Sequence, residues 1–218
     1  MSSKIKNFRD LSVMHGIIMA ISETLRWMWC VITRQPYNGR FRIDRKWIGM
    51  LASRKDMLGA EIGVRYGENA VFLLDALDIE KLYLIDPYDA YEEYQVDWNN
   101  QMMTEAENTA KEKLGAFGNV KFIKKYSEDA VTDLPENLDF VYIDGNHEYG
   151  YVKSDIINYW PILKEGGILA GHDYTRSFPG VVEAVDEFAN RKGLYVTADL
   201  WGDWFLQKPM QKEPEAVK

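Results

Sequence analysis

The chain has 218 residues, of which 46% are hydrophobic, so it is long enough to enclose one sizeable core. Its formal net charge of −8 argues against a general nucleic-acid binder, which would present a basic surface. A single cysteine, Cys30, excludes an internal disulfide and a multi-cysteine zinc site, and it favours a reducing compartment such as the cytoplasm.

The charge is unevenly divided along the chain. Residues 1–50 hold nine Lys/Arg and three Asp/Glu, a charge of +6, so residues 51–218 carry −14. This asymmetry divides the chain into a helical N-terminal extension over 1–50 and a main domain that we expect over 51–210. The polar residues at 211–218 are expected to form a tail.

The extension carries an apolar stripe with alternating spacings of three and four, typical of a heptad helix: Leu11, Met14, Ile18, Ile21, Leu25, Met28 and Ile32. We expect this helix to pack on the body or on a second copy of the chain, which would give a homodimer. Trp27 and Trp29 also fit a helix lying on a membrane surface. A signal peptide is a further interpretation, although no clean cleavage site follows the apolar stretch. Glu23 and Arg26 make the stripe too polar for a membrane-spanning helix.

From about residue 55 the pattern alternates between strand and helix. Strands are expected at 57–63, 81–86, 120–124, 138–143 and 168–171, followed by a closing pair at 194–198 and 204–207. Helices are expected at 68–77, 102–114, 127–134, between the fourth strand and residue 163, and at 181–192. Residues 87–101 read as a polar loop and 164–167 as a turn. The fold class is therefore α/β, with a Rossmann-like, doubly wound sheet of seven mainly parallel strands and a C-terminal antiparallel strand.

Four acids lie at or just beyond the ends of successive predicted strands: Glu61, Asp86, Asp144 and Asp173. Sheets of this class bind ligands outside the carboxyl ends of their strands. The four acids therefore predict one shared ligand crevice.

The first strand runs into the pattern E-x-G-x-x-x-G, with glycines at Gly63 and Gly67. Glycine lets the backbone turn tightly and approach a ligand, but the pattern lacks the G-x-G-x-x-G of a pyrophosphate cradle. Asp86 follows 23 residues after Gly63, where a carboxylate can accept both hydroxyls of a ribose. These features indicate a nucleoside-bearing ligand whose other end is not a pyrophosphate.

Five segments carry a resemblance to a known family: "AEIGVRYGENA", "LYLIDPY", "KKYSEDAV", "LDFVYIDGNHEYGYVKSDI" and "LKEGGILAGHDY". Together, and in this order, they resemble the class I S-adenosylmethionine-dependent methyltransferases over about residues 57–207. The pattern Asp-x-x-His-x-Tyr, followed by Gly-Gly-x-x-x-x-His-Asp-Tyr, is most similar to the small-molecule branch that includes the cephalosporin and macrolide-sugar O-methyltransferases.

The resemblance implies S-adenosylmethionine as the cofactor and makes residues 51–210 the domain that binds it. It assigns the contacts as follows: Gly63 and Gly67 at the methionine part, Glu61 near its ammonium, Asp86 at the ribose, Ser127 and Glu128 by the adenine, and Asp144 at the cofactor edge.

The resemblance also implies a catalytic site at the fourth and fifth strand ends. In the catechol-type relatives the acid after strand four binds magnesium, and a basic side chain three residues later acts as the base; here these are Asp144 and His147. Two further metal ligands would be His172 and Asp173, in a site suited to Mg²⁺ or Mn²⁺. His172 stands where a carboxylate is usual. The alternative is that Asp144 and Asp173 bind no metal and only cap helices or form hydrogen bonds to the edge of the cofactor.

The sequence thus predicts a methyltransferase that acts on an oxygen of a small polar molecule such as a sugar, with N-methylation left open and no nucleic-acid acceptor. One alternative is a non-catalytic nucleoside-binding or scaffold protein of the same fold. Another is a nicotinamide oxidoreductase, which the missing glycine fingerprint disfavours. The acceptor is expected to be chosen by the extension and by the aromatic residues of the 87–101 loop.

Overall fold

The computed structural model describes residues 45–93 and 96–210. The heptad stripe, Cys30 and the polar tail lie outside the described residues, so the predictions that depend on them stay predictions. The boundary expected at residue 50 also stays a prediction. No helix in the described part of the chain is long and apolar enough to cross a membrane.

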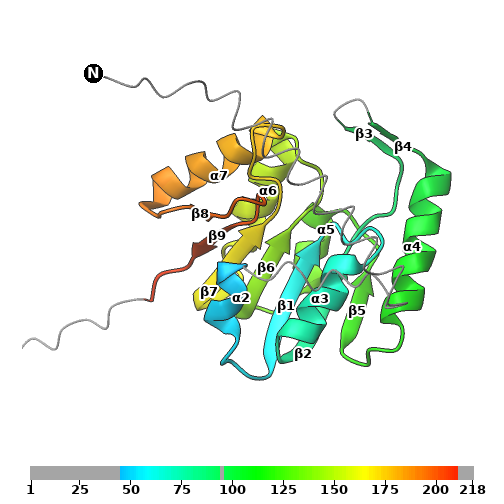
Figure 1. Cartoon of the computed structure of the whole chain (residues 1–218), viewed down its shortest axis with the longest axis horizontal. Helices are drawn as coiled ribbons and strands as arrows, with labels where there is room; N and C mark the ends of the chain where they lie inside the picture. The colour runs from blue at the N-terminus through cyan, green and yellow to red at the C-terminus, as the bar shows by residue number, and fades with distance from the viewer. Residues whose placement is uncertain (1–44, 94–95, 211–218) are drawn as a thin grey trace, which may run out of the picture. The chain divides into compact units, whose positions relative to one another are not determined.

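One seven-stranded sheet forms the centre of the body (Figure 1). Its strands, in spatial order, are β5 (Val120–Ile123), β2 (Ile79–Ile85), β1 (Met57–Ile62), β6 (Leu138–Ile143), β7 (Leu163–Gly171), β9 (Trp204–Gln207) and β8 (Thr197–Ala198). Neighbouring strands are parallel from β5 to β7, whereas β9 pairs antiparallel with both β7 and β8. The predicted mainly parallel seven-stranded fold is therefore confirmed.

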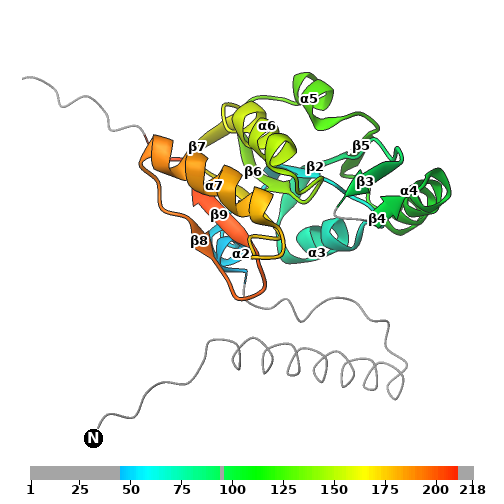
Figure 2. The ribbon, with the colours of Figure 1, turned by 90° about the horizontal axis from the view of Figure 1, so that it is seen from above.

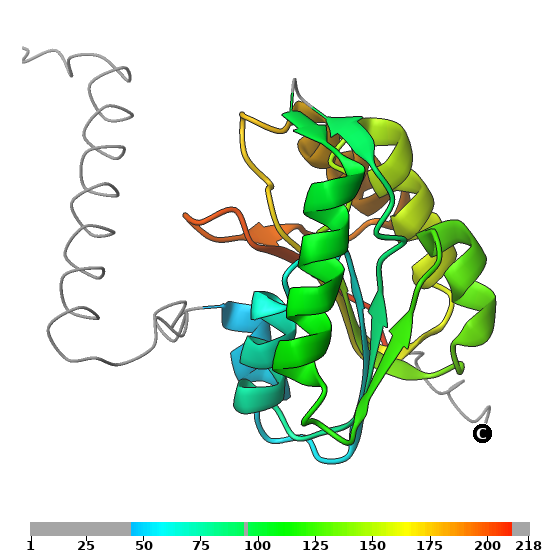
Figure 3. The same cartoon turned by 90° about the vertical axis from the view of Figure 1, so that its right-hand side faces the viewer.

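Helices cover both faces of this sheet (Figures 2 and 3). They are α2 (Lys46–Leu51), α3 (Glu68–Ala76), α4 (Asn100–Leu114), α5 (Ser127–Ala130), the 3₁₀ turn η1 (Val131–Asp133), α6 (Tyr149–Tyr159) and α7 (Pro179–Lys192). Buried residues of α6 and α7, such as Ile156 and Val185, pack on one face, whereas Leu73 of α3 and Ala110 of α4 belong to the core of the other. Both faces bury apolar side chains, which is why the central strands read as continuous hydrophobic runs.

Two features differ from the sequence prediction. Residues predicted as a loop contain a short antiparallel hairpin, β3 (Tyr91–Glu93) and β4 (Val96–Trp98). The predicted turn at 164–167 is wrong, because strand β7 already begins at Leu163. Gly166, at φ +68°, lets the strand continue through an irregular register, and its backbone N–H donates to the carbonyl of Lys208 at 2.9 Å.

The chain order places a switch point between β1 and β6. The sheet grows outward from β1 through β2 to β5, and the chain then returns to pair β6 with the other side of β1. Backbone hydrogen bonds join the strand ends there: the N–H of Asp144 donates to Ile62 at 2.8 Å, and that of Gly63 to Ile85 at 2.9 Å. The loops after these strands therefore gather at one edge, where such folds bind ligands.

Candidate active site

The turn after β1 is shaped by two glycines with positive φ, Gly63 at +83° and Gly67 at +80°. A Cβ built on Gly63 would lie 2.1 Å from the backbone oxygen of Asp144, and one on Gly67 would lie 2.8 Å from Leu114. Any side chain at Gly63 would therefore separate the turn from the tip of β6. The turn and that tip form one continuous backbone surface.

Asp86 closes the same turn from the end of β2. Its Oδ2 accepts backbone N–H bonds from Val64 at 3.0 Å and Arg65 at 2.9 Å, and its Oδ1 accepts the N–H of Tyr88 at 2.8 Å. Burial raises the pKa of Asp86, and these three hydrogen bonds oppose that rise. A carboxylate oxygen has two lone-pair directions, so Asp86 can hold the turn and still accept a further hydroxyl.

Glu61 lies below the turn, with 1% of its surface exposed. Burial raises its pKa to about 8, and the hydrogen bond from Asn69 opposes that rise. Asn69 Nδ2 donates to Glu61 Oε1 at 3.1 Å, whereas Oε2 is buried without a hydrogen-bond partner.

Asn69 connects Glu61 to an arginine that the sequence prediction left in the basic extension. Arg45 Nη1 donates to Asn69 Oδ1, and Arg45 Nε donates to Asp203 Oδ2 at 2.9 Å. Tyr142 donates its hydroxyl to the other oxygen of Asp203 at 2.6 Å. These five residues are called the Arg45 network below.

Ser127, predicted to lie by the adenine, begins α5 and is tied to α6. Its hydroxyl donates to Asp155 Oδ1, and its carbonyl accepts the hydroxyl of Tyr159 at 2.8 Å. Burial raises the pKa of Asp155 to about 7, and the bond from Ser127 opposes that rise. Glu128, the next residue, is exposed. Asp155 and Tyr159 were not singled out from the sequence.

Three predicted site residues, two of them catalytic and one a metal ligand, come together where β6 and β7 end. Ligand atoms of Asp144, His147 and Asp173 all lie within 4.8 Å of one another, so the described residues include a group able to hold a metal ion. His147 Nε2 lies 2.9 Å from Asp173 Oδ2 and 3.6 Å from Asp144 Oδ1. This group is called the catalytic corner below.

His172, predicted as a metal ligand, lies beside this corner. Its Nδ1 is 3.1 Å from Asp173 Oδ2, but it does not belong to the group of three. Asp173 adopts a left-handed backbone at φ +60°, unusual for a residue other than glycine. Although burial raises the pKa of Asp173, its hydrogen bonds with His147 and His172 bring it below its ordinary value.

Glu93, on β3, is a site residue that the sequence prediction missed. Its Oε1 accepts the backbone N–H of His147 and lies 3.0 Å from the ring Nδ1. Burial lowers the pKa of His147, but hydrogen bonds to Asp144, Asp173 and Glu93 outweigh it and raise that pKa to about 11. In this arrangement the imidazole is charged at neutral pH.

The hairpin that carries Glu93 also contacts the glycine turn. The guanidinium of Arg65 lies 4.1 Å from the ring centre of Trp98, and Trp98 stacks on Tyr91 with centroids 6.2 Å apart. The hairpin therefore touches the glycine turn through Trp98 and the catalytic corner through Glu93.

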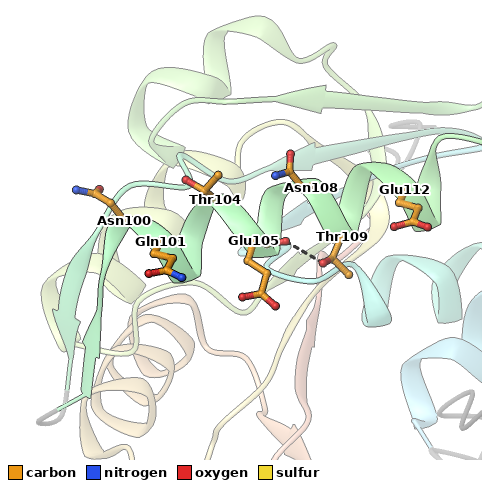
Figure 4. A pocket seen from close by; sticks show the side chains of 7 residues that line it. All are labelled: Asn100, Gln101, Thr104, Glu105, Asn108, Thr109 and Glu112. Atoms are coloured by element: carbon orange, nitrogen blue, oxygen red, sulfur yellow. Dashed lines mark hydrogen bonds between the residues drawn. The ribbon is translucent and has the colours of Figure 1, made fainter.

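A surface depression on α4 is separate from this site (Figure 4). All of its lining comes from one helix: Asn100, Gln101, Thr104, Glu105, Asn108, Thr109 and Glu112. None of the predicted site residues lines it. Because its side chains are polar and belong to a single helix face, we assign it to the solvated surface.

Comparison with known proteins places the chain in a family. A family model described as "Methyltransferase domain" matches residues 60–174, which is just over half of the chain. The protein "Uncharacterized protein R132" of Acanthamoeba polyphaga mimivirus is 29% identical over 141 residues, 62% of this chain. The match spans only 60% of that relative's length.

Solved structures share the fold at low identity. The O-methyltransferase NovP superposes with a TM-score of 0.59 at 16% identity, over 76% of this chain and 79% of its own. A protein of Streptococcus mutans, solved in complex with SAH, superposes with a TM-score of 0.57 at 16% identity, over 76% of this chain and 97% of its own. An rRNA methylase from Streptococcus thermophilus superposes with a TM-score of 0.55 at 17% identity, over 78% of this chain and 99% of its own. The fold is therefore shared by proteins with different acceptors.

Proposed function

Because this chain belongs to the methyltransferase domain family and uses S-adenosylmethionine, we propose that it methylates an oxygen of a small polar molecule at the catalytic corner. The observation that carries the proposal is that Asp144, His147 and Asp173 converge beside the glycine turn. The donor's sulfonium makes its methyl group reactive, so the protein needs to position the acceptor and remove its proton.

The cofactor is assigned to the edge of the sheet between β1 and β6. Gly63 and Gly67, whose positive φ shapes the turn, are assigned to the methionine part, Glu61 to its ammonium and Asp86 to the ribose. Ser127 and Glu128, which follow β5 in the chain, are assigned to the adenine. Asp144 borders both the cofactor turn and the corner, since its backbone oxygen faces Gly63.

His147 is proposed as the group that takes the acceptor's proton. Both of its ring nitrogens face carboxylates, Nδ1 toward Glu93 and Nε2 toward Asp173. A ring held in this way retains a proton and acts as a donor. His147 can therefore act as a base only when the negative charge of Asp144 and Asp173 is neutralised.

A divalent cation would provide that neutralisation. The carboxylates of Asp144 and Asp173, with ligand atoms within 4.8 Å of one another, provide oxygen ligands of the kind that Mg²⁺ or Mn²⁺ prefers. Asp144 and Asp173 are the ligands we assign, and His172, which contacts Asp173, is proposed as the third. A bound cation would lower the pKa of an acceptor hydroxyl that it contacts.

The acceptor class follows from charge and from the hairpin. Acidic side chains at the catalytic corner would repel the phosphate backbone of a nucleic acid, and the net charge of −8 adds to this repulsion. Aromatic rings of Tyr91 and Trp98 next to the corner can stack on a sugar or another ring. These features favour a small polar acceptor over a nucleic acid.

The proposal can be tested by supplying labelled S-adenosylmethionine with a library of small hydroxylated and amino compounds and, separately, with RNA and DNA. A structure with the product cofactor would then be determined. A labelled ether product supports O-methylation, whereas a labelled amine or nucleic acid contradicts it. A protein that binds the cofactor but labels no compound and has no acceptor space at the corner would contradict catalysis.

A further inference from the structure

The Arg45 network contains two buried polar atoms without partners. Arg45 Nη2 and Glu61 Oε2 both lack a hydrogen bond, although their residues are only 4% and 1% exposed. A buried polar atom left unpaired costs about 1–3 kcal/mol, and more when the group is charged. A ligand that pairs with both atoms would remove this cost, so the network has the features of a binding site.

The two atoms belong to groups of opposite sign joined through one side chain. Asn69 donates to Glu61 Oε1 at 3.1 Å and accepts from Arg45 Nη1, so it lies between the guanidinium and the carboxyl. The charged groups thus stand side by side, each with one atom free. A zwitterion fits this arrangement, because its carboxylate can accept from Nη2 and its ammonium can donate to Oε2.

Arg45 is held firmly enough to act as a preformed binding group. Asp203 accepts from its Nε at 2.9 Å, and its guanidinium carbon lies 5.1 Å from the centre of the Phe72 ring and 4.9 Å from that of Tyr142. These contacts occupy Nε and Nη1 and place two aromatic rings beside the guanidinium, and they leave Nη2 for a ligand. A prepositioned arginine loses little side-chain entropy when it binds a carboxylate.

The network lies beside the cofactor turn, since Glu61 is two residues before Gly63 and Asn69 two residues after Gly67. We propose that Arg45 binds the carboxylate of the cofactor's methionine end, while Glu61 Oε2 accepts its ammonium. Arg45 precedes the segment matched by the family model, so the cofactor site extends into a part of the chain that the family match does not cover. The inference rests on the proposed cofactor site, in which Glu61 is already assigned to the ammonium, and it adds Arg45 as the residue that binds the carboxylate.

Ligands that differ only at the amino-acid end provide the test. The Kd of full-length protein would be measured by calorimetry for S-adenosylhomocysteine and for 5′-methylthioadenosine, which lacks the amino-acid group. Arg45→Met should raise the Kd for S-adenosylhomocysteine about 10- to 100-fold, the range expected for the loss of a charged hydrogen bond. The Kd for 5′-methylthioadenosine should stay within about twofold of the wild-type value. Arg54→Met is the matched control, because Arg54 pairs with Asp139 at the other end of the strands.

Equal weakening of both ligands in Arg45→Met, or no weakening, would overturn the proposal. If this variant does not fold, the wild-type protein provides a second test. Its Kd for decarboxylated S-adenosylmethionine should be at least about 10-fold higher than its Kd for S-adenosylmethionine. Equal affinities would overturn the proposal. A wild-type protein that binds none of these adenosyl compounds would instead contradict the cofactor site itself.

Discussion

Glu93 on β3 accepts the backbone N–H of His147 and places its Oε1 3.0 Å from the ring Nδ1 of the same residue. One carboxylate thus fixes both the backbone and the imidazole of the proposed base. Because Glu93 belongs to the hairpin that also packs Trp98 on Arg65, the position of the hairpin and the orientation of His147 are linked.

Glu93 should therefore act as a positioning residue. Glu93→Ala is expected to lower kcat about 10- to 100-fold, typical for loss of a group that orients a site side chain, and to leave the KM for S-adenosylmethionine nearly unchanged. Glu93→Gln keeps an acceptor oxygen and should restore most of the rate. Nitrogen NMR of the His147 ring should show the loss of the hydrogen bond from Nδ1–H in the alanine variant, whereas Glu93→Gln should keep it. An alanine variant with wild-type kcat contradicts this role.

Asp86→Ala should lose most of the affinity for S-adenosylmethionine. The change removes the proposed ribose acceptor and leaves the N–H groups of Val64, Arg65 and Tyr88 without their partner, so the free energy of unfolding should also fall by about 1–3 kcal/mol. Calorimetry, at a temperature where the variant is folded, measures the first effect, and chemical denaturation the second. An unchanged Kd would refute the ribose assignment, whatever happens to stability.

Asp155 gives a prediction about pH. Its folded-state pKa of about 7 lies above the ordinary value near 4, so its contribution to stability is complete below pH 4 and is lost as the pH rises through 7. Asp155→Asn, which still accepts from Ser127, should remove on the order of 3 kcal/mol of the fall in unfolding free energy between pH 4 and 8. Denaturation at several pH values measures it.

The control for this prediction is Asp129→Asn, which removes a charge from an exposed carboxyl on the same short helix as Ser127. It should follow the wild-type dependence on pH. If Asp155→Asn also follows the wild-type curve, the buried carboxyl does not hold the proton that we assign to it.

The heptad stripe of residues 11–32 should support self-association, since an apolar face of that length is unfavourable in water. Light scattering should give a dimer mass for the full chain and a monomer mass for residues 36–218, which retain Arg45. A monomeric full-length protein rules out the dimer and leaves packing on the body or on a membrane surface.

The sequence was informative where buried strands end in polar residues. Asp86, Asp144 and Asp173 follow apolar runs, and parallel strands bring their carboxyl ends to the same edge, so the shared position of these acids could be predicted. Which histidine joins them could not be predicted, because that depends on the directions of the side chains. In the structure, His147 rather than His172 forms the group with Asp144 and Asp173.

Two further site residues had no readable signal. Glu93 lies on a strand of three residues, too short to show alternation, and reaches a partner 54 positions away. Arg45 looked like one basic residue among several in the extension, and only its burial against Asp203 distinguishes it. Contacts between segments distant in the chain decide both cases.

The most direct test of the central claim is transfer of labelled methyl from S-adenosylmethionine to the acceptor found in the library, with and without a metal chelator, by wild type and His147→Ala. The account predicts that chelator abolishes transfer by the wild type while cofactor binding persists, that Mg²⁺ or Mn²⁺ restores it, and that His147→Ala lowers the rate about 10²–10⁴-fold. Wild-type transfer that is indifferent to chelator, together with normal turnover by His147→Ala, would contradict chemistry at the catalytic corner.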